Sequence, residues 1–419
     1  MDGITKLALA IACGLALSAC GGGGGDDGVA NSPPGATTSP GGGSNGSSGG
    51  SGSGSTNDGG GQNSASPSSY AVSTIAGISH GIGSTDGPAA SATFNQPSGV
   101  AVGPDGSVYV ADTFNLKIRK IANGTVSTVA GTGGLPTSSL SGDGPCASAL
   151  FASPQGLAVD QTGTIYVADY TIAAIYHAVA VRKIINPGTA ACTVSTLASG
   201  SVTSPVATNL WAPWALTLDA AGNVYVSDND SVRKITPAGD ITTIAGNTLV
   251  PGYADGPGTS ALFSDPRGIA LGPDGNLYVA EVTYNNIRMI TPNGIVTTWA
   301  GSSAGLDGPS RPYGLIDGAG TSALFDGPFG LAFGPNGALY VADTGNNAIR
   351  RIMLDAQVTT IAGTVIPSVN GYNTGKRGCD DGPANQATFS DPMDVAVDAN
   401  GAIYVADKSC NAIRKITPQ

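Results

Sequence analysis

Short apolar runs alternate with turn-forming residues from residue 70 to the end of the chain, in a unit that recurs six times. Each unit begins with a Pro, and a Tyr follows 12 residues later in all six: Pro97, Pro154, Pro213, Pro266, Pro328 and Pro392. In the first unit an apolar run over 100–102 leads into Pro104-Asp105-Gly106 and then a second run ending at Asp112. This pattern predicts a β-hairpin in every unit.

Two further strands follow the hairpin, at 118–121 and 126–131 in the first unit. Six units of four short antiparallel strands favour a radial propeller over a linear solenoid. The chain opens with an isolated fourth strand at 71–77 and stops after a third strand at Gln419. We therefore predict an all-β, six-bladed β-propeller over 70–419, in which the N-terminal strand completes the last blade and closes the ring.

Three recurring strings carry a family resemblance. They are Pro-x-Gly-Val-Ala-Val, Tyr-Val-Ala-Asp-Thr-Gly-Asn-Asn-Ala-Ile-Arg-Arg-Ile at 340–352, and Thr-Thr-Ile-Ala-Gly at 359–363. Together they resemble NHL repeats, and the resemblance covers all of 70–419. It implies a six-bladed propeller, but a fold of this kind determines function poorly.

Every unit carries one acid three residues after its Tyr and one Arg on its third strand. The acids are Asp112, Asp169, Asp228, Glu281, Asp343 and Asp407, and the arginines are Arg119, Arg182, Arg233, Arg288, Arg350 and Arg414. We expect the acids to cap the turn between strands two and three. The arginines beside them predict one internal ion pair or backbone clamp per blade, because a ligand site seldom has six equal copies.

A third signature precedes five of the six units: Asp-Gly lies eleven residues before the Pro, and a Phe lies three before it. The phenylalanines are Phe94, Phe151, Phe263, Phe325 and Phe389. We expect these side chains to be packing pegs, and the segment 258–263 to form one short helical turn. No Asp-Gly loop has enough spaced oxygen ligands to resemble a calcium loop, so we predict no metal and no cofactor.

Composition agrees with short strands and many turns. The chain has 419 residues with 64 Gly and 27 Pro, and only 11% of its residues are charged. Gly and Pro break helix interiors, so a helical protein is excluded. The net charge of −11 excludes a nucleic-acid binder that works by bulk charge.

Residues 1–19 predict a secretion signal, with Lys6 before an apolar run that is too short to span a bilayer. The ending Leu17-Ser18-Ala19-Cys20 resembles the lipobox of bacterial lipoproteins, which implies lipid attachment at Cys20. An ordinary signal peptide cleaved near Ala19 is the alternative. Gly21 follows in place of Asp, and by the same resemblance this favours the outer membrane, with the protein facing the periplasm or the cell surface.

Residues 20–69 predict a disordered tether after the lipidated Cys. Of the 49 residues from 21 to 69, 18 are Gly and 12 are Ser, with no aromatic residue. Such a segment cannot form a core. It would hold the propeller clear of a membrane at a span of roughly 40 Å.

The predicted propeller has one face that varies from blade to blade, formed by the loops between strands two and three and by the blade linkers. The residue after each repeat Pro, at the mouth of the central channel, also differs in every blade. Variable positions in a regular repeat can carry recognition. The candidate ligand-binding residues are Trp214, Arg267 and Phe329 at the mouth, Tyr170 and Tyr176 in the insertion of unit two, and Arg311, Tyr313, Tyr372 and Arg377 in two linkers. The alternative is that some of them merely plug the channel.

Catalytic motifs are scarce. The two histidines, His80 and His177, share no repeat position, and neither a Gly-x-Ser-x-Gly elbow nor a phosphate-binding glycine loop occurs. We therefore predict a non-enzymatic, monomeric, membrane-anchored module that binds protein or glycan, and no nucleic acid, in the envelope or outside the cell. A metal-dependent lactonase, which would need carboxylates converging on the channel, and a structural envelope or adhesion component are the alternatives.

Four cysteines remain after the signal and the lipobox. Cys379 and Cys410 both fall on the variable face, so a disulfide between them is predicted in an exported protein. Cys146 and Cys192 fall on opposite faces, about 17 Å apart, which is too far to bridge. A disulfide between them would require the insertion of unit two to fold across the blade.

Overall fold

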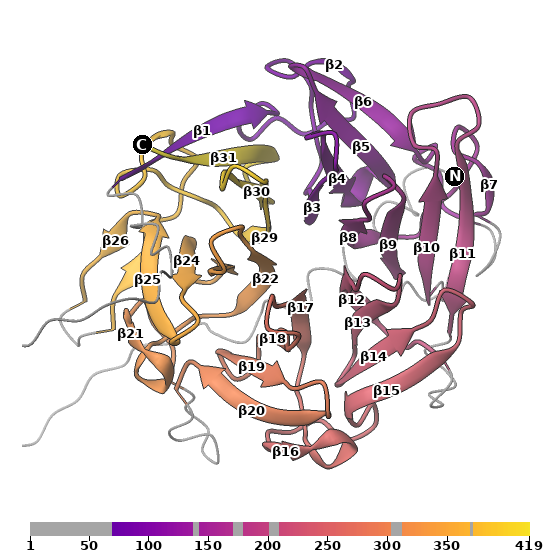
Figure 1. The fold of residues 1–419 in the computed structure, drawn as a ribbon. Helices are drawn as coiled ribbons and strands as arrows, with labels where there is room; N and C mark the ends of the chain where they lie inside the picture. Colours follow the sequence, from indigo (N-terminus) through magenta and orange to yellow (C-terminus); the bar gives the residue numbers. More distant parts are fainter. Residues whose placement is uncertain (1–68, 137–141, 171–178, 201–208, 303–311, 369–371) are drawn as a thin grey trace, which may run out of the picture. The chain divides into compact units, whose positions relative to one another are not determined.

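The computed structural model describes residues 69–136, 142–170, 179–200, 209–302, 312–368 and 372–419. These residues form six antiparallel sheets arranged as blades around a central axis (Figure 1). The predicted all-β, six-bladed propeller is confirmed. The predictions for the signal, Cys20 and the tether, and for Tyr176, His177 and Arg311, lie outside the described residues.

Each blade runs from an inner strand beside the axis to an outer strand at the rim. Blades one and two are β3 (Gly99–Val102), β4 (Val108–Asp112), β5 (Lys117–Ala122) and β6 (Thr125–Ala130), then β8 (Pro154–Val159), β9 (Ile165–Tyr170), β10 (Val179–Ile185) and β11 (Thr193–Ser199). Blades three and four are β12 (Pro213–Leu218), β13 (Val224–Asp228), β14 (Ser231–Ile235) and β15 (Ile241–Gly246), then β17 (Pro266–Leu271), β18 (Leu277–Glu281), β19 (Asn286–Ile290) and β20 (Ile295–Ala300). Blade five is β22 (Pro328–Phe333), β23 (Leu339–Asp343), β24 (Ala348–Ile352) and β25 (Gln357–Ala362).

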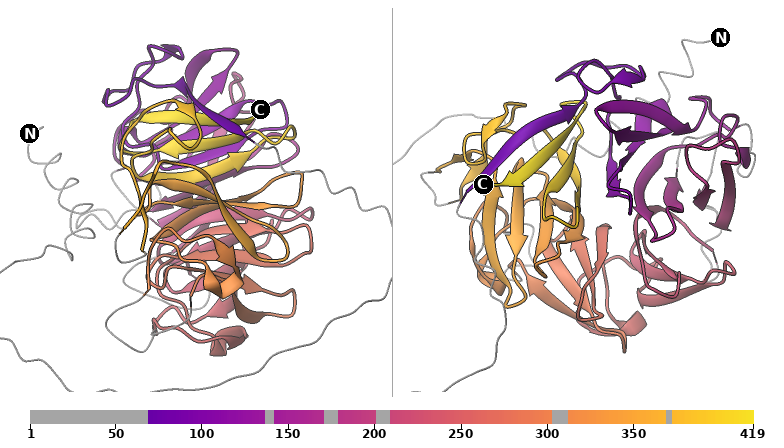
Figure 2. Two further views of the ribbon diagram at one scale, coloured as in Figure 1. Left: turned by 90° about the vertical axis from the view of Figure 1, so that its left-hand side faces the viewer. Right: turned by 45° about the horizontal axis from the view of Figure 1, so that its top comes forward.

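Blade six joins the two ends of the propeller. It consists of β29 (Pro392–Val397), β30 (Ile403–Asp407), β31 (Ala412–Pro418) and, as its fourth strand, β1 (Tyr70–Ala76). Val72 of β1 pairs with Ile416 of β31, and Figure 2 shows indigo β1 beside the yellow C-terminal strands. The predicted closure of the ring by the N-terminal strand is confirmed.

A fifth, two-residue strand lies outside the fourth strand in five blades, and we did not predict it. These strands are β2 (Gly87–Pro88), β7 (Gly144–Pro145), β16 (Gly256–Pro257), β21 (Gly318–Ala319) and β28 (Gly382–Pro383). Each follows the Asp of the Asp-Gly signature, and Gly87 has a φ of +126°, which favours glycine. The linker therefore runs back along the outer edge of the blade. Two short strands, β26 (Val365–Ile366) and β27 (Thr374–Gly375), form a separate pair in the last linker.

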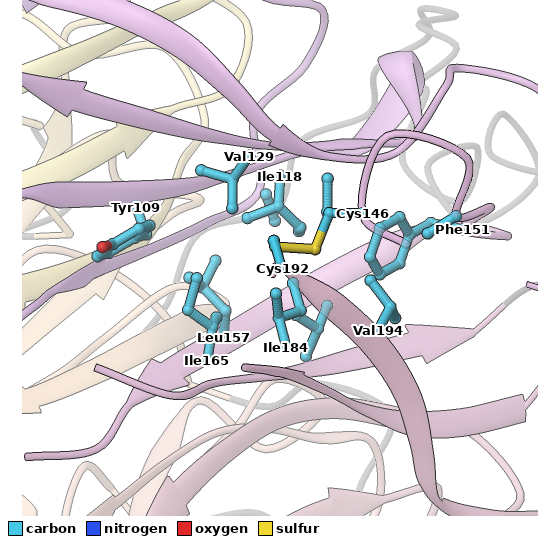
Figure 3. Close-up of a cluster of buried hydrophobic side chains, with 14 of the residues drawn as sticks. Tyr109, Ile118, Val129, Cys146, Phe151, Leu157, Ile165, Ile184, Cys192 and Val194 are labelled. Atoms are coloured by element: carbon cyan, nitrogen blue, oxygen red, sulfur yellow. A yellow bond between two sulfur atoms is a disulfide. The ribbon is translucent and has the colours of Figure 1, made fainter. Parts of the chain in front are cut away.

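This outer strand corrects our prediction for Cys146 and Cys192, which are disulfide-bonded with their Cα atoms 5.4 Å apart. Because β7 pairs antiparallel with β11, with Pro145 opposite Thr193, the linker carries Cys146 down to the opposite face. The bond lies in the apolar cluster between blades one and two (Figure 3). The predicted Cys379–Cys410 disulfide is confirmed, with a Cα–Cα distance of 5.8 Å.

The repeated acid and Arg form the predicted internal clamp. In blade five, Arg350 donates to Asp343 at 2.7 Å, to Asp317 of the Asp-Gly signature at 2.9 Å, and to the carbonyl oxygens of Leu324 and Ile316. The acid also binds the predicted turn, because the Asp343 carboxylate accepts the side-chain amide of Asn346 at 2.9 Å. Its second oxygen accepts the backbone N–H of Asp326, just before strand one, at 2.8 Å, which we did not predict. The pair therefore fastens the blade linker to the blade.

The predicted packing pegs are also confirmed. Phe94, Phe151, Phe263, Phe325 and Phe389 are fully buried between blades. The guanidinium carbon of Arg350 lies 4.9 Å from the centre of the Phe325 ring, and four other blades repeat this contact, blade three excepted. The short helical turn expected at 258–263 is the 3₁₀ turn η2 (Gly258–Ser260), with a counterpart at η3 (Gly320–Ser322), whereas η1 (Thr113–Asn115) lies between strands two and three of blade one.

Candidate functional site

The variable residues after the repeat prolines come together at one end of the central channel. Trp214, Arg267 and Phe329 are the second residues of β12, β17 and β22 in three successive blades. The guanidinium carbon of Arg267 lies 3.4 Å from the Trp214 ring centre and 5.4 Å from that of Phe329. The two aromatic rings meet edge to face at 6.1 Å. Arg267 thus bridges two aromatic rings across the end of the channel.

Polar and aromatic neighbours hold this cluster in place. Nε of Arg267 lies 2.6 Å from Oδ1 of Asp265, and burial lowers the pKa of Arg267. The Tyr170 ring meets Trp214 edge to face at 5.9 Å, and burial raises the pKa of Tyr170 to about 12. Four of the predicted ligand-binding residues are therefore brought into one cluster.

The cluster narrows this end of the channel. This end of the channel has a hollow of only about 20 Å³. In five blades the residue after the repeat Pro lines it, and in the fourth blade Gly268, the neighbour of Arg267, lines it instead. Trp214 and Phe329 are nevertheless partly exposed. The cluster accordingly combines a packed, plug-like interior with an outer surface that a partner can touch.

Three further candidates among the described residues, Tyr313, Tyr372 and Arg377, lie on the blade linkers of the same face. Tyr313 and Tyr372 expose 56% and 51% of their surface, and the two linkers meet where the N–H of Leu315 donates to the carbonyl of Asn373 at 2.7 Å. Arg377 is apart from them, paired with Asp391 at 2.6 Å. These side chains therefore form an outer rim, separate from the channel-end cluster.

Exposed apolar side chains gather on this variable face. Eight of the eleven large exposed hydrophobic side chains among the described residues follow a fourth strand or sit in a linker: Ile78, Ile82, Leu249, Val250, Tyr313, Val365, Ile366 and Tyr372. Only Ile185, Ile295 and Leu354 lie at turns between strands three and four, on the opposite face. Sequence reasoning found the two tyrosines but missed the aliphatic residues, which have no fixed repeat position.

Below the cluster the channel widens into a cavity of about 320 Å³ lined by the six inner strands. Its side chains are apolar except for Thr217 and one carboxylate, Asp394 of β29. Asp394 occupies a position that is Gly or Ala in the other five blades. Our sequence reasoning noted the variable residue before it but passed over this substitution, although aligning the six repeats reveals it.

Asp394 is held by backbone groups alone. Oδ2 accepts the N–H of Val100, from the neighbouring blade, at 3.0 Å, and Oδ1 accepts the N–H of Val395 at 2.9 Å. Burial raises the pKa of Asp394 from 3.8 to about 7, and these two N–H groups offset only part of that rise. A single carboxylate in an apolar channel does not form the converging carboxylates that a metal-dependent lactonase requires.

Two features of the described residues concern metals and membranes. In this part of the chain, no group of three or more His, Cys, Asp or Glu side chains is placed to hold a metal ion. Across the same residues, no helix is long and apolar enough to cross a membrane.

Comparison with known proteins agrees with this architecture. Residues 94–121, 151–171 and 325–352 match the NHL repeat. Teneurin-3 of Danio rerio is 33% identical over 285 residues, covering 59% of this chain, but the chain spans only 10% of the teneurin. The chain therefore carries NHL repeats in a six-bladed propeller and matches a small part of this much longer relative.

Solved structures show the same fold. A protein of unknown function from Bacteroides thetaiotaomicron superposes with a TM-score of 0.62 at 22% identity, covering 83% of this chain and 76% of that one. An auxiliary nutrient binding protein from Bacteroides ovatus superposes with a TM-score of 0.57 at 16% identity, covering 84% and 77%. At these identities the likeness establishes the fold alone.

Proposed function

We propose that this protein is a non-catalytic binding module that engages a protein partner through the variable face of its propeller. The observation that carries the proposal is the concentration of exposed apolar side chains on the blade linkers of that face. Four of these residues, Tyr313, Val365, Ile366 and Tyr372, lie on two linkers that are joined by the Leu315–Asn373 hydrogen bond, and exposed apolar residues grouped in this way mark interaction surfaces. Aliphatic side chains such as Ile366 and Leu249 favour a protein over a glycan, because they offer a sugar neither a flat ring nor a hydrogen bond.

The channel-end cluster fits the centre of such an interface. Trp, Tyr and Arg are the residues that most often dominate binding energy at protein interfaces. Trp214, Arg267 and Tyr170 already contact one another, so little side-chain freedom is lost on binding. The apolar linkers would then surround this centre.

We further propose that the protein is exported and anchored to the cell envelope, at the outer membrane, through lipid on Cys20. The lipobox-like ending at Cys20 supports the anchor, and the two disulfides support export, because disulfides persist in oxidising compartments. A Cys20→Ser variant should appear in the soluble envelope fraction while the parent stays with membranes. Retention of the variant in membranes would show that Cys20 is not the anchor.

The binding proposal is tested by affinity capture from intact envelopes, with the full-length protein as bait. We expect Ile366→Asp and Tyr372→Asp, on the variable face, to lower recovery of a reproducible protein partner at least tenfold. Ile185→Asp and Leu354→Asp make the same change on the opposite face and should leave recovery unchanged. Equal losses from both pairs would contradict the proposed face, and capture that a soluble glycan competes away would favour the glycan alternative.

A further inference from the structure

The wide part of the central channel lies away from the proposed protein-binding face. Its lining extends to the last residue of five inner strands, next to the turns between strands one and two: Val102, Val159, Leu271, Phe333 and Val397. All five are partly exposed, so this end of the channel meets solvent, whereas the other end narrows to about 20 Å³. A volume of about 320 Å³ is within the range of small-molecule sites, roughly 300–1,000 Å³.

Among the described residues, Asp394 is the only charged side chain that lines this cavity. The six buried acids of the repeat each have an Arg partner, as Asp407 has Arg414 at 2.9 Å. Asp394 has none, and its hydrogen bonds are to the two backbone N–H groups of Val100 and Val395. A carboxylate that lines an apolar channel is normally paired with a cation, so the remaining lone pairs of Asp394 can accept hydrogen bonds from a cationic ligand.

The surroundings of Asp394 select the kind of cation. Inner strands such as β3 and β29 are the last strands of their sheets, so their free edges offer backbone carbonyls to the channel. Divalent metals require six or more oxygen ligands or retained water, and one carboxylate among Val, Ala and Leu side chains is a poor set. An ammonium or amidinium group on a small apolar body matches the carboxylate, the carbonyls and the apolar walls together.

We propose that the channel binds a small organic cation, a primary amine or amidine with an apolar body, whose charged group pairs with Asp394. The ligand enters from the face of the turns between strands one and two. Asp394 also borders the narrow hollow at the channel-end cluster, but the ligand approaches it from the opposite end of the channel, so either proposal can fail without the other.

A purely structural role for Asp394 is the alternative. Its bond to the N–H of Val100 joins blade six to blade one, where the two ends of the propeller meet. An Asp394→Asn variant separates the two roles, because the amide oxygen can still accept that N–H while the negative charge is lost. Asp326→Asn is the matched control, since Asp326 also has a pKa raised by burial but lies outside the cavity lining.

The test is calorimetric titration of the purified full-length protein with n-butylamine and with benzamidine, using n-butanol and benzamide as neutral counterparts. We expect saturable binding of at least one cation at pH 8, no binding of its neutral counterpart, and about tenfold or greater weakening in Asp394→Asn but not in Asp326→Asn. Binding should also weaken from pH 8 to pH 5.5, where Asp394 is protonated. The packed strands β3 and β22 carry no charged residue, but burial also raises the pKa of Asp407 of β30 to about 7 and of Asp343 of β23 to about 6. The pH dependence is therefore assigned to Asp394 only if it disappears in Asp394→Asn.

Three results would overturn the proposal. They are the absence of saturable binding by either cation, equal binding by parent and Asp394→Asn, and binding of Ca²⁺ or Na⁺ that depends on Asp394 while the amines do not bind. In the first two cases the role of Asp394 is structural, and its hydrogen bond to Val100 holds blade six against blade one. In the third the channel is an inorganic cation site.

Discussion

At the scale of single residues, the acids in the interior of this propeller have two kinds of partner: an Arg side chain, or backbone N–H groups alone. Six acids are each neutralised by an Arg that also fastens backbone carbonyls, and these clamps repeat with the fold. Asp394 breaks the pattern, because it replaces a Gly or Ala of the other blades and is satisfied only by backbone N–H groups. We infer that the clamp, which is present in all six blades, stabilises the fold, whereas the single carboxylate of Asp394 has a specific function.

The charge on Asp394 should cost the protein stability above neutral pH. Its pKa is about 7 when folded and 3.8 in the reference state, so the folded protein holds this proton more tightly. The stabilisation is complete below pH 4 and is lost as pH rises through 7, by about 4 kcal/mol for a shift of this size at most. Asp394→Asn should therefore raise the unfolding free energy at pH 8, by roughly 1–3 kcal/mol, and change it little at pH 4. Denaturant titrations at both pH values measure this, and an equal effect at both would contradict the linkage.

The contribution of an Arg clamp to stability can be compared with that of a surface ion pair at two neighbouring residues of β5. Arg119 pairs at 2.6 Å with the fully buried Asp112, whereas Lys120 pairs at 3.0 Å with the exposed Asp105. Arg119→Ala leaves a carboxylate buried without its cation and should cost about 3–5 kcal/mol. Lys120→Ala should cost less than about 1 kcal/mol. Urea unfolding of both variants provides the comparison, and similar losses would mean that the clamp is no stronger than a surface pair.

At the scale of elements, local patterns predicted most of the fold. The hairpins, the third and fourth strands and the phenylalanine pegs follow from residues within about a dozen positions of one another. The fifth strand does not, because Gly87-Pro88 is too short to show a period and pairs with 125–126, nearly forty residues on. The same long-range pairing hid the Cys146–Cys192 disulfide, which a four-stranded blade makes impossible.

The residues at the end of the channel were only partly predictable, because their contacts also join positions that are far apart in the sequence. The variable positions after the repeat prolines could be read from the repeats, and Trp214, Arg267 and Phe329 do meet. Arg267 stacks on two rings and narrows the channel. This arrangement depends on contacts between three blades, and the sequence of a single repeat does not specify them.

The fifth strand and its disulfide should hold the second blade linker against the outer edge. The Cys146–Cys192 bond spans 46 residues, and it constrains the unfolded chain more than a short loop would. Replacing both cysteines by Ala should lower the unfolding free energy by about 2–4 kcal/mol. The Cys379/Cys410 double Ala variant removes the other disulfide, which spans 31 residues in blade six, and serves for comparison. Thermal unfolding with and without reductant checks both, and a variant as stable as the oxidised parent would mean that the outer strand holds the linker without the bond.

At the scale of the whole molecule, the propeller depends on a contact between the two ends of its chain. β1 supplies the fourth strand of blade six, and Tyr70, Val72 and Ala76 bury their side chains there. The seam is reinforced where the N–H of His80 donates to the carbonyl of Cys410 at 2.9 Å, beside the Cys379–Cys410 disulfide. Without β1, strand β31 would present an unpaired edge, which is a template for pairing with another chain.

Two truncations test this closure. A chain beginning at residue 69 keeps β1 and should unfold at the same temperature as the parent. A chain beginning at residue 78 loses β1 and about 1.5–3 kcal/mol for each large apolar side chain that β1 buries, so its unfolding temperature should fall sharply. It should also self-associate in analytical ultracentrifugation, because β31 is left free to pair with a second copy. A monomeric, equally stable product would mean that blade six closes the ring with three strands and that the N-terminal strand is dispensable.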